Sequence, residues 1–161
     1  MTTIECTLAQ LEFNRTRTLA SLERAAQWDA PAMALGCRPG AGRAHVAWQL
    51  MHIAITEELF ATERLRPEKP TIMADLIPRF RGGSNVDDLI PSVKEIRAAL
   101  DQSRERLTAT LRSFTDADLE WKPEALKARD LRFRDVLQIL VWHEAHHQGQ
   151  AHLTLNLLAN A

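Results

Sequence analysis

The chain has 161 residues, of which 45% are hydrophobic and 25% are charged, as expected for a soluble globular protein with one domain spanning residues 1–161. Its formal net charge is −1 and its lysines and arginines form no basic block, which disfavours binding to DNA or RNA. The chain has no run of about 18 apolar residues, no secretory-signal pattern in residues 1–10, and two cysteines without CxxC spacing. We therefore expect a cytoplasmic protein that does not bind membranes.

The first predicted element is an amphipathic helix over roughly residues 3–27, because its apolar residues recur at helical spacing. Arg15 and Thr18 fall on the same apolar stripe. We interpret them as a snorkelling side chain or the wet end of the core, with the alternative that they line a polar pocket. Residues 29–42 contain two prolines and three glycines, a density that predicts a loop.

A second helix is predicted over residues 43–65, because apolar residues recur at three- and four-residue steps until Pro67. Two histidines interrupt its inward stripe, which consists of His45, Trp48, His52, Ile55 and Leu59. The connection that follows, residues 66–88, contains several prolines and glycines. A crossover of this length lets the next helix lie anywhere in a bundle, and such loops often cover a site.

The third predicted helix, residues 90–114, has the clearest apolar spacing in the chain. After a short helical fragment at residues 115–121, a last helix is predicted from about residue 130 to residue 158. One side of it carries Val136, Leu140, His143, His147, Gln150 or Ala151, and Thr154. No stretch alternates as a half-buried strand would. The sequence therefore predicts an all-α fold, a four-helix bundle with a long connection between its second and third helices.

The last helix carries a pair of histidines at the spacing of metal ligands. Residues four apart on a helix differ by about 40° around the axis and ~6 Å along it, so His143 and His147 can bind one metal ion. His52 is the candidate third ligand, because an unpaired imidazole on an apolar face would cost roughly 1–3 kcal/mol. Three histidines leave positions open for water or substrate. The other histidines are expected to be solvated or to orient the ligands: His45, His146 and His152.

Residues 143–147 also spell H-E-x-x-H, the zinc peptidase motif in which Glu144 would be the general base. That motif needs a third ligand downstream, but residues 148–161 contain no Asp or Glu. Gly149 and His152 each come one position too early for the metzincin extension. A zinc peptidase is therefore the minor alternative, and no general base is assigned.

Two interpretations without catalysis also remain open. In the first, the metal stabilises a bundle that serves as an interaction module. Such a structural site would be closed by a fourth protein ligand, for example His146 or Glu58. In the second, the bundle holds no metal and its histidines form hydrogen bonds with one another.

Two segments resemble those of a known family. Residues 43–53, Arg-Ala-His-Val-Ala-Trp-Gln-Leu-Met-His-Ile, resemble the second-helix motif of the DinB-like (DinB/YfiT) superfamily. Residues 137–150, which end in His-Glu-Ala-His-His-Gln-Gly-Gln, resemble its last-helix signature H-x-x-x-H-x-G-Q. The helix order and the long connection are also similar. The chain departs from the pattern at Gln148, where many relatives have arginine.

The resemblance implies an up-down-down-up four-helix bundle that forms a homodimer. It also implies that His52, His143 and His147 bind a divalent metal ion such as nickel, zinc or iron. Characterised relatives include transferases and isomerases that use low-molecular-weight thiols such as bacillithiol or mycothiol. The expected function is therefore a metal-dependent thiol S-transferase or hydrolase acting on a small-molecule substrate.

Overall fold

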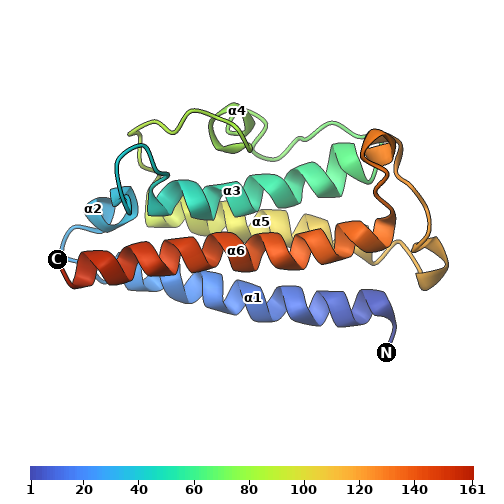
Figure 1. Ribbon diagram of the computed structural model, residues 1–161, viewed down its shortest axis with the longest axis horizontal. Helices are drawn as coiled ribbons and strands as arrows, with labels where there is room; N and C mark the ends of the chain where they lie inside the picture. Colours follow the sequence, from blue (N-terminus) through green and yellow to red (C-terminus); the bar gives the residue numbers. More distant parts are fainter.

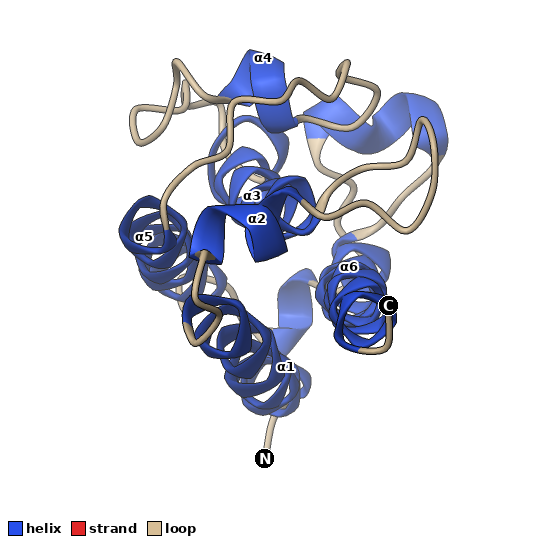
Figure 2. Cartoon of the chain, turned by 90° about the vertical axis from the view of Figure 1, so that its left-hand side faces the viewer, coloured by secondary structure: helices blue, strands red, loops and turns tan.

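The computed structural model describes residues 1–161, which form helices and turns without strands. Four long helices lie side by side in a bundle (Figure 1): α1 (Thr3–Ala26), α3 (Val46–Leu59), α5 (Val93–Leu111) and α6 (Phe133–Ala159). Helices α1 and α3 each pack against both α5 and α6, and Figure 2 shows the four helices from one end. The predicted all-α fold is confirmed.

Helix α3 begins at Val46 rather than at the predicted residue 43, because His45 caps it. The Nδ1 atom of His45 accepts a hydrogen bond of 2.9 Å from the backbone N–H of Trp48. The Nε2 atom of His45 lies 3.1 Å from the carbonyl oxygen of Asp87. His45 is fully buried at this cap. His45 is therefore a helix cap rather than part of the inward stripe, and of its two predicted roles the solvated one is wrong.

Helix α3 is the central element, because every one of its residues is buried. A short helix, α2 (Pro31–Gly36), packs against it and lies within the segment predicted to be a loop. The long connection forms α4 (Ile77–Phe80), which also packs against α3 and lies above it in Figure 1. The side chain of Phe80 is buried there. The connection thus covers the helix that carries His52.

The remaining elements are short. Helix α3 continues into a π-helical turn, Phe60–Arg64, and two 3₁₀ turns follow α5, at Asp116–Asp118 and Glu124–Arg129. Helix α6 begins a few residues later than predicted. None of the helices combines the length and the apolar character needed to cross a membrane.

A layer of buried charged side chains lies near the boundary between two apolar cores. Leucines from all four long helices form much of these cores, among them Leu22, Leu50, Leu100 and Leu155 in one and Leu11, Leu107 and Leu140 in the other. Near the boundary between the two cores, each long helix contributes one charged residue to a buried group whose members bond to one another. These four residues, the charge layer, are Arg15, Glu57, Arg104 and Glu144.

The charge layer neutralises itself. Both arginines bond to both glutamates, and Arg15 does so at 2.8 Å to each. Thr18 donates a further hydrogen bond of 2.9 Å to Glu144. Burial raises the pKa of Glu57, but the adjacent charges of Arg15 and Arg104 outweigh this effect and hold the pKa below its ordinary value. The carboxylate is therefore ionised in the bundle interior.

The position of Arg15 corrects the sequence-based interpretation. Arg15 is 4% exposed and Thr18 is fully buried, so neither snorkels to solvent nor marks a wet end of the core. Two buried glutamates on other helices satisfy them instead. Because these partners are far away in the sequence, the apolar periodicity of α1 gives no sign of them.

Removing one member of the charge layer should destabilise the bundle strongly. Arg15→Met leaves two carboxylates short of a buried partner, and we expect the free energy of unfolding in urea to fall by about 3–5 kcal/mol. The matched control is Arg97→Met, which removes an exposed ion pair with Glu23. That change should cost about 1 kcal/mol or less. Equal effects of the two substitutions would contradict a structural role for the charge layer.

Candidate metal centre

The three predicted ligands lie together between α3 and α6. His52 comes from the middle of α3, and His143 and His147 stand one turn apart on α6. One ring nitrogen from each lies within 4.8 Å of the others. The Nε2 atoms of His52 and His143 are 3.1 Å apart. The fold therefore brings together the histidines that the sequence singled out.

The geometry suits a shared metal ion. Nitrogens bound to one zinc ion at about 2.0–2.1 Å each are separated by about 3.0–3.4 Å, which matches the 3.1 Å between His52 and His143. Imidazole ligands also suit nickel, iron and copper. The same contact can be an N–H···N hydrogen bond in the metal-free chain. The predicted metal-free arrangement and the metal site thus use the same side chains.

The ring of His52 is held from two sides. Its Nδ1 donates a hydrogen bond of 2.6 Å to the carbonyl oxygen of Phe80, which leaves Nε2 unprotonated and facing the other histidines. Trp48 stacks on the ring with centroids 4.5 Å apart and planes 15° apart. The indole N–H of Trp48 is itself 3.2 Å from the carbonyl oxygen of Arg79. The long connection therefore orients a metal ligand as well as covering it.

His147 is oriented by a chain of amides. Its Nδ1 donates to Oε1 of Gln49 at 2.6 Å, and Nε2 of Gln49 donates to Oε1 of Gln150 at 2.9 Å. The amide of Gln150 donates in turn to Nε2 of His146 at 2.6 Å. Gln49 lies three residues before His52, on the same side of α3. A glutamine within an apolar helix is the sign of this role in the sequence, but Gln49 was not among the predicted site residues.

The environment keeps the imidazoles neutral. Burial, with a smaller contribution from the neighbouring His52, lowers the pKa of His143 to about 3. Burial likewise lowers the pKa of His147 to about 2, with a contribution from His143. The pKa of His52 is also lowered by burial, although its hydrogen bond to Phe80 opposes the change. Neutral imidazoles are the form that binds metals, so all three are ready to do so at pH 7.

Glu144 does not face the histidines. Its carboxylate is 1% exposed and is bound within the charge layer by Arg15, Arg104 and Thr18. Glu144 therefore does not face solvent either. A carboxylate held in this way cannot act as general base on a metal-bound water. The H-E-x-x-H motif of this chain therefore lacks the general base that a zinc peptidase needs. The chain also lacks the strand at which a peptidase would bind its substrate.

Neither candidate for a fourth ligand belongs to the cluster. His146 is exposed and stacks on Trp142. Glu58 is buried elsewhere, 3.7 Å from Arg106, and its carboxylate oxygens accept no hydrogen bond. His152 is exposed as well. The histidine cluster instead opens into a cavity of about 410 Å³, whose wall includes His52 and His143.

A comparison with protein families now identifies the chain. The family model of the DinB superfamily matches residues 10–151. The chain belongs to the DinB superfamily. This confirms the resemblance predicted from residues 43–53 and 137–150, which lie within the match. A search of the curated proteins and a search of the solved structures each returned no match.

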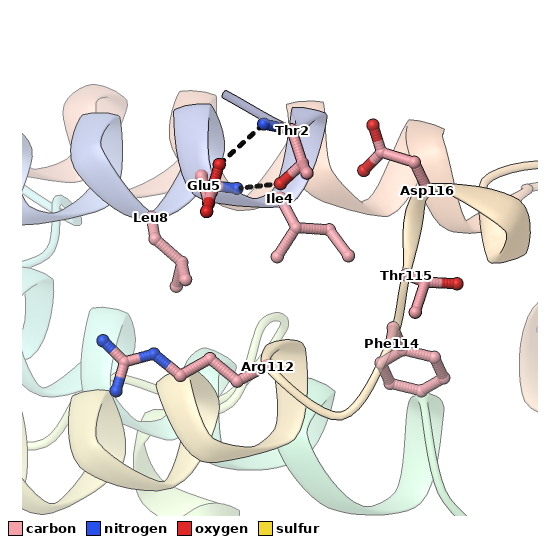
Figure 3. A pocket seen from close by; sticks show the side chains of 8 residues that line it. All are labelled: Thr2, Ile4, Glu5, Leu8, Arg112, Phe114, Thr115 and Asp116. Carbon is pink, nitrogen blue, oxygen red and sulfur yellow. Dashed lines mark hydrogen bonds between the residues drawn. The ribbon is translucent and has the colours of Figure 1, made fainter.

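This DinB-superfamily chain also has a larger hollow of about 490 Å³, shown in Figure 3. It lies between the start of α1 and the end of α5 and contains no histidine. Thr2 and Glu5 in its wall bond to each other in the capping box that begins α1. Arg112, at the end of α5, lies across the hollow from them. These side chains give no cluster of metal ligands.

Gln49→Leu tests the amide chain. Losing the acceptor for His147 should weaken zinc binding by about 10–100-fold in a competition titration with a chromophoric chelator. Gln49→Glu keeps an acceptor and should largely retain the affinity. The control is Gln148→Leu, because the side chain of Gln148 bonds to Ser21 on α1 and forms no hydrogen bond with a candidate ligand. Equal affinities for Gln49→Leu and Gln148→Leu would show that Gln49 does not support the metal.

Proposed function

We propose that this member of the DinB superfamily is a metalloenzyme that binds one divalent metal ion through His52, His143 and His147 and acts on a small molecule. The observation that carries the proposal is the convergence of three neutral imidazoles beside an open cavity. The open side favours catalysis over a purely stabilising metal, for which a fourth protein ligand is expected.

The chain's own residues would prepare the site before a metal or substrate arrives. The Phe80 carbonyl and the Trp48 ring fix His52, and Gln49 fixes His147. Aliphatic side chains in the cavity wall, including Leu131 and Ile139, would exclude water from part of the bound substrate. A divalent metal held here would supply Lewis acidity, lowering the pKa of a bound water or thiol toward neutrality.

The family resemblance suggests either a thiol S-transferase, with a low-molecular-weight thiol as second substrate, or a hydrolase. The cavity wall favours the transferase, because it contains no carboxylate that could act as general base. A thiol loses its proton far more easily than water, with an ordinary pKa of about 8.5 against about 15.7. A site without a protein base is thus better suited to a thiol nucleophile. Nickel, zinc and iron are all candidates, since imidazole accepts each of them.

We also propose that the bundle has the up-down-down-up order of helices. Support comes from the direction of the chain in Figure 1, where α1 and α6 run from right to left and α3 and α5 run from left to right. This order places α3 beside α6, with which it packs. The two helices that carry the histidines are then neighbours.

The proposal is tested by metal content and metal-dependent activity. Protein purified without chelators should contain about one divalent metal per chain by elemental analysis. The double variant His143→Ala, His147→Ala should contain almost none, while the control His152→Ala, at an exposed position of the same helix, should keep its metal. Full metal content in the double variant would overturn the site.

Conjugation of low-molecular-weight thiols to model electrophiles then tests the reaction. The metal-loaded protein should accelerate it, and the double variant should not. Retained activity in the double variant would overturn a metal-dependent transferase even if the metal content behaves as expected.

A further inference from the structure

Three arginines line the cavity beside the histidine cluster. Arg64 ends the π-helical turn after α3, Arg81 follows α4, and Arg129 ends the second 3₁₀ turn. They come from three separate segments of the chain and line the same cavity, where Arg64 is half-buried and Arg81 and Arg129 are exposed. We call them the cavity arginines.

The cavity arginines have no protein counterion. None of the three forms an ion pair or a side-chain hydrogen bond, in contrast to Arg132 and Arg134, which both pair with Glu120. No Asp or Glu lines the cavity. Two acidic residues are direct neighbours in the sequence, Glu63 beside Arg64 and Asp130 beside Arg129. Both are exposed and outside the cavity wall, and Asp130 pairs with Lys122. The cavity therefore holds an excess of positive charge.

The backbone brings Arg64 to this place. The N–H of Leu65 donates to the carbonyl oxygen of Phe60 at 3.2 Å, a bond that spans five residues and widens the helix. A wider turn rotates the chain less per residue, so Arg64 stays near the helix face that carries His52 and Thr56. Its guanidinium lies 4.5 Å from the centre of the Phe60 ring. π-Helical turns are frequent at functional sites.

The arginines share one cavity wall with His52 and His143, and their positive charges repel one another there. Burial lowers the pKa of Arg64, and the positive charges of Arg129 and Arg81 lower it further, while Glu63 opposes this. The pKa of His52 is lowered mainly by burial, and its hydrogen bond to Phe80 opposes this. The positive charge of Arg64 lowers the pKa of His52 by a smaller amount. A bound anion would relieve this repulsion. Arginine is the residue best suited to hold it, since its planar group can donate two parallel hydrogen bonds to a carboxylate or phosphate.

We propose that the substrate of this site is a small acid whose carboxylate or phosphate group is bound by Arg64, Arg81 and Arg129 while its reactive part reaches His52 and His143. This proposal rests on the proposed function, because only a catalytic site makes the bound acid a substrate. Binding of the acid by the arginines does not require the metal. Leu126, Leu131 and Ile139 in the same wall suit an apolar portion of the molecule. Gln148, where many relatives have arginine, bonds to Ser21 and is not part of this wall.

Binding of simple probes tests the proposal by isothermal titration calorimetry on the full chain. Phenyl phosphate and phenylacetate are the two anionic probes, and phenylacetamide is their neutral counterpart. At least one acid should bind about tenfold or more tightly than the amide, with an affinity that falls as salt is added. The tighter acid identifies the substrate as a phosphate ester or a carboxylic acid. Binding of phenylacetamide as tight as that of both acids would overturn the proposal.

Charge-removing variants locate the bound anion. Arg64→Gln and the double variant Arg81→Gln, Arg129→Gln should each weaken the acid by about tenfold or more. Arg112→Gln is the matched control, because Arg112 is also without an ion pair but lines the hollow of Figure 3. It should change the affinity by less than about twofold. Losses as large in the control as in the cavity variants would overturn the assignment, provided that circular dichroism shows every variant folded.

The histidine double variant distinguishes anion binding by the arginines from anion binding by a metal ion. Because it keeps all three cavity arginines, His143→Ala, His147→Ala should still bind the acid without a metal. If anion binding disappears in that variant but persists in both arginine variants, the anion is held by the metal and the role of the arginines is overturned. Loss of metal with retained anion binding would support the subsite independently of the proposed reaction.

Discussion

The charge layer is the constraint on which the rest of the structure depends. Arg15, Glu57, Arg104 and Glu144 lie inside the bundle, one from each long helix, and each arginine bonds to both glutamates. Buried charges tolerate no loss of a partner, so the four helices must keep their mutual register. A slip of α6 by one residue would rotate its side chains by about 100° and withdraw Glu144 from the arginines. With Glu144 fixed on one side, His143 and His147 face α3 on another. The residue that resembled a peptidase base instead orients the helix that carries the candidate ligands.

The chain uses its charged residues in two contrasting ways. In the charge layer, two arginines and two glutamates cancel, and threonine and serine hydroxyls bond to the remaining carboxylate lone pairs. In the cavity beside the histidines, three arginines face the open space without a carboxylate. The first arrangement is complete within the protein and stabilises one register. The second has no counterion within the protein, which is why we associate it with an acidic substrate.

Local periodicity accounts for what the sequence predicted correctly. The apolar stripes located the four long helices to within a few residues, and the spacing of His143 and His147 selected the pair that converges on His52. Two of the unexpected features depend on partners that are distant in the sequence. Arg15 is satisfied by Glu57 and Glu144, and His52 is oriented by a backbone carbonyl that any residue at position 80 would provide. Periodicity carries no information about such partners. The homodimer and the up-down-down-up order stay predictions.

X-ray absorption at the metal edge of the zinc-loaded chain tests the central claim most directly. The account predicts three imidazole nitrogens at about 2.0–2.1 Å and at least one further light atom from water or substrate. Cys6 and Cys37 are free thiols on other parts of the chain, so no sulfur ligand at about 2.3 Å is expected. A sulfur shell, a fourth imidazole, or a spectrum that does not change in the His52→Ala variant would contradict a metal centre built from His52, His143 and His147.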